Sequence, residues 1–193
     1  MAKLYLATEE PADALLSTDP LALLIGMLLD QQVPMERAFV APYRLAERLG
    51  AVRLDAATLA EYDPDALSEI FATPPALHRF PGAMAARTQK LCRQILDDYN
   101  GDAAAVWTGA EDGSDLVKRI GKLPGFGKQK AQIFAALLGK QLGVRPAGWR
   151  AAAGSYAEDG VFRSVADITD DDSLAKVREH KKQAKAAAKA AKG

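Results

Sequence analysis

The chain has 193 residues, 49% of them hydrophobic, and its 25 Lys and Arg residues balance 25 Asp and Glu residues. Because Ala and Leu dominate the hydrophobic set, the composition favours helices over strands, in one compact unit or two small lobes. The single cysteine, Cys92, excludes a disulfide framework and any four-cysteine zinc or iron–sulfur site. The sequence lacks a signal-peptide core and the roughly 20-residue apolar run of a membrane span, so we expect a cytoplasmic protein without membrane association.

The charge is unevenly placed along this neutral chain. Residues 174–193 carry seven Lys or Arg residues and one Glu, a net charge of +6, so residues 1–173 carry −6. Lys181, Lys185 and Lys189 recur every four residues and form one basic stripe if this tail is helical. Its low complexity predicts that much of it is disordered when free, and such a tail neutralises DNA phosphates without reading sequence.

The first strong signal is Asp19-Pro20, a capping side chain followed by proline at the first helical position. The segment that follows, Leu21–Leu29, is apolar on every face and therefore predicts the buried central helix. It ends where Gln31 and Gln32 emerge from the core just before Pro34. These two amides are either helix-end residues that meet solvent or residues with a role in binding.

Further helices and one loop are predicted in the next part of the chain. The expected helices are Met35–Val40, Tyr43–Leu49, one after Asp55, one after Asp63-Pro64, and Ala83–Tyr99 before the stop signal Asn100-Gly101. Thr73–Gly82 contains four helix breakers and predicts a loop, which carries His78 and Phe80 between prolines. Taken alone, Phe80 is most simply an anchor that packs the loop down.

The most informative stretch is Lys122–Lys130, which reads Lys-Leu-Pro-Gly-Phe-Gly-Lys-Gln-Lys between predicted helices at 115–120 and 131–138. Pro124 ends the first helix, and the two glycines after it permit backbone angles and close approaches that other residues do not. The second helix then begins with free N–H groups and a positive dipole end among three lysines, which favours a phosphate oxygen. A tight turn within a helical bundle is the alternative interpretation.

After a second hairpin helix that runs to about Gln141, the sequence from Val144 to Gly160 is irregular and glycine-rich. Trp149 and Tyr156 are large aromatic residues in this loop, and they either stack on a base or act as hydrophobic pegs. A last helix is predicted after Asp170, because negative charge suits a helix N-terminus.

The string Leu123–Gly127, Leu-Pro-Gly-Phe-Gly, resembles the hairpin of the helix-hairpin-helix DNA glycosylase superfamily, the endonuclease III and adenine-glycosylase group. The resemblance implies an all-α, two-lobed fold for residues 1–173, followed by the basic tail 174–193. The hairpin-bearing lobe would span about 35–143, and a second lobe would join the N- and C-terminal segments. DNA would lie in the cleft between the lobes, with no iron–sulfur cluster or other cofactor.

The resemblance also implies which residues contact DNA. Gln32 matches the family's glutamine that fills the hole left by a flipped base. Phe80 matches an apolar wedge against the opposite strand, with His78 as a neighbouring candidate; such a wedge offsets part of the few kcal/mol needed to unstack a base. The hairpin residues that would grip the DNA backbone beside the flipped nucleotide are Leu123, Gly125, Phe126, Gly127, Lys128 and Lys130.

The chain departs from the family pattern where the chemistry is expected. The family places an aspartate in the loop after the second hairpin helix, but Val144–Ala157 contains no Asp or Glu. The first acids after it are Glu158 and Asp159. Asp159 is our candidate for the catalytic carboxylate, and a surface turn at Glu158–Gly160 is the alternative. Members that cut the strand carry a Schiff-base lysine where this chain has Gln129, which argues against lyase activity.

Three functions are compatible with these signals. The first is a monofunctional DNA glycosylase of base excision repair, which flips a damaged base out of duplex DNA and holds it against Trp149 or Tyr156. The second is a catalytically silent protein that binds damaged or branched DNA for a partner, as the missing aspartate indicates. A helical protein whose hairpin mediates only protein contacts is the third. The expected partners are duplex DNA and downstream repair proteins, in the nucleoid region of the cytoplasm.

Overall fold

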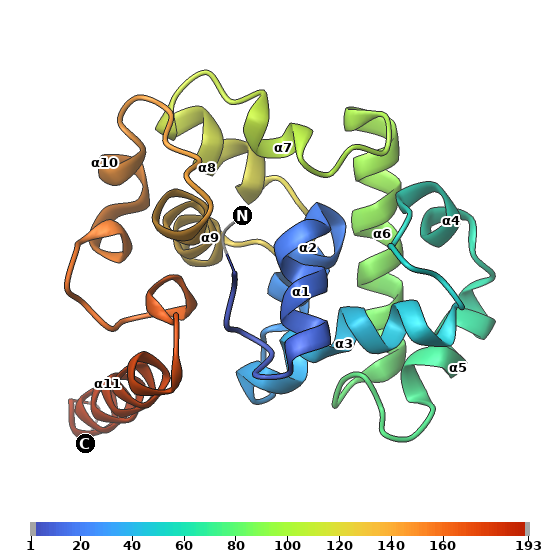
Figure 1. Ribbon diagram of the computed structural model, residues 1–193, viewed down its shortest axis with the longest axis horizontal. Helices are drawn as coiled ribbons and strands as arrows, with labels where there is room; N and C mark the ends of the chain where they lie inside the picture. Colours follow the sequence, from blue (N-terminus) through green and yellow to red (C-terminus); the bar gives the residue numbers. More distant parts are fainter. Residues whose placement is uncertain (1–2, 192–193) are drawn as a thin grey trace.

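The computed structural model describes residues 3–191, which form helices joined by short connections and contain no strand (Figure 1). The α-helices are α1 (Glu10–Thr18), α2 (Pro20–Leu29), α3 (Met35–Arg48), α4 (Ala56–Glu61), α5 (Pro64–Ala72), α6 (Pro81–Tyr99), α7 (Ala105–Thr108), α8 (Gly113–Gly121), α9 (Lys128–Gln141), α10 (Trp149–Ala153) and α11 (Asp171–Ala190). Two 3₁₀ helices, η1 (Gly154–Ala157) and η2 (Val165–Asp167), lie between α10 and α11. The expectation of an all-α protein is confirmed for the described residues.

Helix α2 is the centre of one continuous hydrophobic core, as its apolar sequence predicts. Every residue from Leu21 to Leu29 is buried. Asp19 caps the helix, because its carboxylate accepts hydrogen bonds from the N–H groups of Leu21 and Ala22. The same buried carboxylate also accepts from the N–H of Leu54, so one side chain ties the start of α2 to the segment before α4.

The other helices are arranged around α2 in groups. In the view of Figure 1, α2 lies near the middle, with α4, α5 and α6 on one side and α8, α9 and α10 on the other. Helices α4 and α5 pack on α6, helices α1 and α3 pack with α2, and α8 and α10 pack on α9. The loop between α8 and α9 therefore approaches α2 from the side opposite α6.

Helix α3 is continuous where the sequence predicts two short helices. Pro42 lies inside it and removes one backbone hydrogen bond. The helix persists because its apolar face is buried on both sides of the proline, by Phe39 before it and Leu45 after it. Helix α6 likewise begins at Pro81 instead of Ala83, since proline is well suited to the first helical position.

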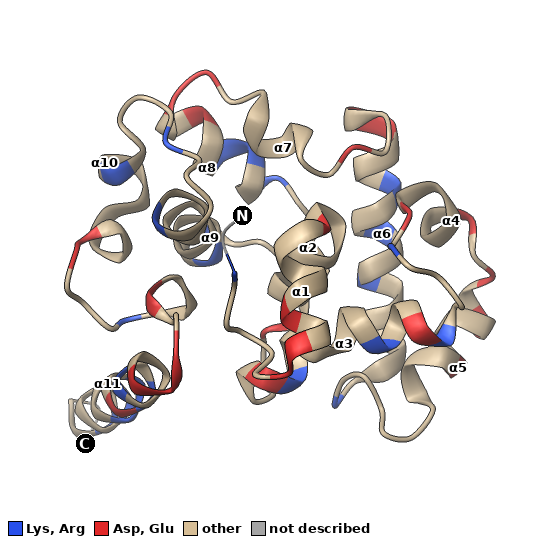
Figure 2. Ribbon diagram, in the orientation of Figure 1, with Lys and Arg blue, Asp and Glu red and all other residues tan. Residues whose placement is uncertain are grey.

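The basic tail is helical to Ala190, in contrast to the disorder expected from its composition. Asp170 caps α11 by accepting a hydrogen bond from the N–H of Ser173, and Ala, Lys and Gln are strong helix formers. Figure 2 shows acidic residues around the start of α11 and basic residues along it. From Arg178 to Ala191 the side chains are exposed; residues 192 and 193 of the tail lie outside the described part of the chain.

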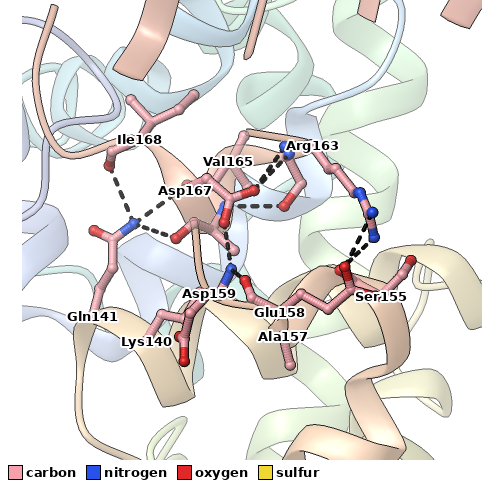
Figure 3. A network of polar contacts seen from close by, with 12 residues as sticks. Lys140, Gln141, Ser155, Ala157, Glu158, Asp159, Arg163, Val165, Asp167 and Ile168 are labelled. Carbon is pink, nitrogen blue, oxygen red and sulfur yellow. Dashed lines mark hydrogen bonds and ion pairs between the residues drawn. The ribbon is translucent and has the colours of Figure 1, made fainter. Parts of the chain in front are cut away.

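The segment between α10 and α11 is folded back across α9 by a network of polar contacts (Figure 3). The Lys140 ammonium on α9 pairs with the buried Asp167 carboxylate and donates to the carbonyl of Glu158. Gln141 donates to the backbone carbonyls of Ala166 and Ile168. These contacts hold residues 158–168 against the C-terminal end of α9, while Gln129 near its N-terminus bonds Tyr156.

Trp149 is a hydrophobic peg in this arrangement. Its ring is buried against Gly139 of α9, where an added Cβ would lie 2.3 Å from the ring. Its backbone lies against Gly113 at the start of α8, where an added Cβ would lie 2.4 Å from the Trp149 Cα. Two glycines therefore make room for one tryptophan, which holds α8, α9 and α10 together.

Within residues 3–191 no single helix has both the length and the apolar character needed to cross a membrane. The pair α1 and α2 has them only when taken together, with a bend of 115° between the two helices.

The contact at Gly113 makes a testable prediction. Gly113→Ala should lower the free energy of unfolding by about 1–3 kcal/mol, because the new methyl group meets backbone atoms of Trp149 that cannot rotate away. Urea unfolding measures the change. Gly121→Ala in the same helix is the matched control: its Cβ has ordinary space, 3.8 Å from the nearest side-chain atom, and should raise stability by up to about 1 kcal/mol. Equal effects of the two substitutions would contradict the packing argument.

Candidate nucleic-acid interface and adjoining cavity

The hairpin, residues 122–127, is anchored by its apolar residues and by the end of α2. Leu123 and Phe126 are buried, and the Phe126 ring packs on Phe134 of α9 with ring centroids 6.2 Å apart. Gly125 has φ +81°, and a Cβ there would lie 2.3 Å from the Leu28 side chain. Only glycine meets both conditions, so this residue permits the close approach of the hairpin to α2.

The opposite side of the hairpin presents free amide groups to solvent. Gly127 has an extended backbone, and nothing lies within 4 Å of a Cβ placed there. The first backbone hydrogen bond into α9 is from the N–H of Ala131 to the carbonyl of Gly127. Within the described chain, the N–H groups of Gly127, Lys128 and Gln129 therefore have no hydrogen-bond partner. Such a helix start, with Lys128 exposed beside it, attracts an anionic oxygen.

Lys130 lies on the other face of α9 and points into the protein. Its ammonium donates to the backbone carbonyls of Met27 at 2.8 Å and Leu28 at 3.3 Å, and lies 5.9 Å from the centre of the Phe126 ring. Neither carbonyl accepts a backbone N–H within the described chain, and both lie at the C-terminal end of α2, where a cation is favourable. Burial lowers the pKa of Lys130 below its usual 10.5. Its contacts bind the hairpin to α2, which leaves Lys128 as the exposed lysine of the pair.

A cavity of about 530 Å³ lies beside the hairpin. It is formed where the end of α2, the first turns of α9, the folded-back segment 155–165 and the basic helix α11 meet. Its lining residues are Met27, Asp30, Gln31, Gln32, Gln129, Lys130, Ile133, Ser155, Tyr156, Arg163, Ser164, Val165, His180, Lys181 and Ala184. We call this space the hairpin cavity.

Of the two glutamines at the end of α2, one is fixed and one is presented to solvent. The Gln31 side chain donates to the carbonyl of Leu28 and accepts from Arg87. Gln32 is exposed at the rim of the hairpin cavity and has φ 57°, a left-handed conformation that costs a residue other than glycine of order 1–3 kcal/mol. The fold therefore holds the Gln32 side chain outward in a strained turn.

His78 holds this turn from behind. The N–H of Phe80 donates to His78 Nδ1 at 3.0 Å, so the proton of the neutral ring lies on Nε2, which donates to the carbonyl of Gln31 at 2.9 Å. Burial lowers the pKa of His78 below its usual 6.5, which favours this neutral form. His78 is fully buried and acts as a positioning residue, whereas Phe80 is 42% exposed, with the Arg79 guanidinium 5.2 Å from its ring centre.

Of the two aromatic residues predicted for a base pocket, only Tyr156 lines the hairpin cavity. Its hydroxyl accepts a hydrogen bond from Gln129 Nε2 at 2.8 Å, across the opening between η1 and α9. Trp149 lies away from the cavity in the packing role described above. Asp159 is also outside it: its exposed carboxylate pairs with Arg150 at 3.1 Å and lines a different hollow.

Asp30 is the carboxylate that sequence reasoning missed. It occupies the C-cap position of α2, and among the described residues it is the only Asp or Glu that lines the hairpin cavity. Burial raises the pKa of Asp30 above its usual 3.8, although the charges of Lys181 and Lys130 oppose this shift. The sequence carried a signal for it, because an acid at a helix C-terminus opposes the helix dipole.

No family model, curated protein or solved structure matches this chain.

The environment of Asp30 predicts a pH-dependent gain in stability for Asp30→Asn. The folded state binds the Asp30 proton more tightly than the unfolded state, so wild-type stability falls as pH rises from 3.8 through the raised pKa. Asn carries no charge, and the variant should be more stable than wild type at pH 7 by about 1 kcal/mol, with no difference well below pH 3.8.

Urea unfolding at a series of pH values tests this. Asp97→Asn is the control, since Asp97 also lies in the last turns of a helix but is exposed, and its gain should be smaller. A destabilised Asp30→Asn variant at pH 7 would contradict this account of the Asp30 environment.

Proposed function

We propose that this protein binds double-stranded DNA through its hairpin and receives a nucleotide extruded from the duplex in the hairpin cavity. In this proposal it is a monofunctional DNA glycosylase of base excision repair. The observation that supports it most is that the free hairpin amides and a cavity lined in part by polar side chains adjoin the same α9 N-terminus. A phosphate held at Gly127 and Lys128 would leave its own nucleotide within reach of Gln129 and Tyr156, which line the cavity.

The size and lining of the hairpin cavity support this function. Its volume of about 530 Å³ falls within the roughly 300–1,000 Å³ of cavities that hold small ligands. The Tyr156 ring offers an apolar face, and Gln129 and Ser155 offer hydrogen-bonding groups for a base edge. Arg163 and Lys181 add positive charge for a phosphodiester at the opening.

Two exposed groups at the rim support the extrusion step. Gln32 is held outward in a left-handed turn, and Phe80 is one of two large hydrophobic residues that the described chain exposes. His78 connects them, since its ring donates a hydrogen bond to the carbonyl of Gln31, next to Gln32, and accepts one from the backbone N–H of Phe80. In the proposed complex, Gln32 fills the space of the extruded nucleotide and Phe80 contacts the opposite strand.

A catalytically silent DNA-binding protein is the second candidate function. It is favoured by the position of Asp159, which pairs with Arg150 outside the hairpin cavity, and by the absence of acids in Val144–Ala157. Such a protein would bind lesion-bearing or branched duplexes and release no base. Both candidate functions require binding to duplex DNA, so a binding assay tests them together. Release of a base distinguishes the glycosylase from the silent binder.

The first test removes a single hairpin amide. Lys128→Pro deletes the N–H and the charge, and the fold should accept it, because Lys128 is the first residue of α9 and the preceding Gly127 is extended. Lys128→Ala deletes the charge alone. Lys128→Pro should bind duplex DNA about tenfold more weakly than Lys128→Ala, since a hydrogen bond to a charged oxygen contributes about 1.5–3 kcal/mol. Fluorescence anisotropy with a duplex that carries one abasic-site analogue measures both affinities.

Equal affinities of the two Lys128 variants would contradict the assigned role of the amide. If wild-type protein itself shows no salt-dependent affinity for duplex DNA, the third interpretation, a hairpin for protein contacts, replaces the proposed function.

The second test concerns Gln32. Gln32→Gly relieves the left-handed strain, so its stability should equal or exceed that of wild type by up to about 1 kcal/mol. Its affinity for the abasic-analogue duplex should fall several-fold, while its affinity for undamaged duplex stays the same. Asn100→Gly is the control, because Asn100 has a similar φ of 52° at the end of α6 and does not line the hairpin cavity. A Gln32→Gly variant that keeps its preference for the abasic analogue would exclude the insertion role.

A further inference from the structure

We propose that Asp30 is a catalytic residue of the hairpin cavity and supplies the carboxylate for hydrolysis of the N-glycosidic bond. This inference rests on the proposed function, since it needs a nucleotide in the cavity. It assigns the chemistry to the end of α2 and withdraws it from Asp159, which lies outside the cavity in an ion pair with Arg150.

The first observation is that the Asp30 carboxylate is free. Among the residues that line the hairpin cavity it is the only acid, and within residues 3–191 it makes no hydrogen bond or ion pair. In the described chain, the Thr88 hydroxyl oxygen is the only fully buried side-chain N or O atom without a hydrogen-bond partner. The Asp30 oxygens also lack a partner, so they must be open to solvent. A half-buried carboxylate with open oxygens faces a cavity that it shares with Gln32 and Tyr156.

The second observation is the contrast with the aspartates that stabilise the fold. Five of them cap helix N-termini, where each carboxylate accepts a backbone N–H: Asp19, Asp55, Asp63, Asp112 and Asp170. Asp30 occupies the opposite end of a helix, where its charge is disfavoured and, within the described chain, its carboxylate caps no backbone N–H. The strained Gln32 lies two residues later. Residues 30–32 thus contain two locally unfavourable features, an acid at a helix C-terminus and a left-handed glutamine. Such features are expected where function outweighs stability.

The third observation is the charge around Asp30. Lys130 faces it from α9 and Lys181 from α11, and His180 and Arg163 line the same cavity. The lysines lie close enough to favour ionisation of the carboxylate but form no ion pair with it. Burial has the opposite effect, because it favours the protonated carboxyl group. A carboxyl group for which these two effects oppose each other is suited to both accept and return a proton.

The proposed reaction is a simple hydrolysis. The bond between C1′ of the extruded nucleotide and the base nitrogen breaks, and its electron pair leaves with the base. The ionised Asp30 stabilises the positive charge that develops on the sugar, and it accepts a proton from the water whose oxygen forms the new bond to C1′. That proton passes to the departing base nitrogen. The products are the free base and an abasic site, and the carboxylate is regenerated.

The experiment compares Asp30→Asn with Asp159→Asn and wild type. The substrates are short duplexes, each with one uracil, hypoxanthine, 8-oxoguanine, 3-methyladenine or thymine glycol; alkali cleavage at the resulting abasic sites measures single-turnover base release. Binding to the abasic-analogue duplex is measured in parallel. Asp30→Asn should reduce release by about 10²–10⁴-fold and leave the affinity for the analogue unchanged, whereas Asp159→Asn should match wild type.

The outcomes separate the inference from the function that it depends on. If wild-type protein releases a base and Asp30→Asn retains that activity, the inference fails and the glycosylase proposal stands. If wild type binds the analogue duplex but releases no base from any substrate, the inference fails and the silent binder is selected. If wild type does not bind duplex DNA, the proposed function fails as well. Loss of folding would not mimic the expected result, because a misfolded variant would also lose affinity for the analogue.

Discussion

The docking of the hairpin on the end of α2 is the contact on which the rest of the structure depends. Lys130 donates to the carbonyls at the C-terminus of α2, and Gly125 leaves room for the Leu28 side chain. The last carbonyls of a helix have no partner within the helix, and at the end of α2 Lys130 from α9 and the Gln31 side chain donate to them. The same contact turns the opposite side of the hairpin, with the amides of Gly127 and its neighbours, toward solvent.

The cavity follows from this contact and from a second one on α9. Lys140 and Gln141, near the far end of α9, bind the segment that leads to α11 and fold it back along the helix (Figure 3). Tyr156 and Arg163 are thereby brought next to the residues at the end of α2. Lys130, which contacts the end of α2, and Lys140 and Gln141, which contact the folded-back segment, all lie on α9. This one helix therefore positions both Asp30 and Tyr156 relative to the hairpin.

The sequence predicted local structure well where a side chain acts on its own backbone. Asp19 marked the start of the central helix and Asn100 the end of α6, because caps and stop signals act over one turn. Prediction was poorer where packing decides. The two pieces expected on either side of Pro42 form one helix, and Trp149 is a peg because two distant glycines receive it. The Asp30 carboxylate was missed because only the fold brings α9, α11 and the end of α2 together.

We propose that the hairpin amides bind the DNA backbone beside the hairpin cavity. Amide ¹H–¹⁵N spectra of the protein, recorded while an abasic-analogue duplex is added, test it most directly. We predict that the largest shifts occur at Gly127, Lys128 and Gln129, with a second group at residues 155–165 of the cavity wall. Saturable binding of the duplex without shifts at those three hairpin amides would contradict the account.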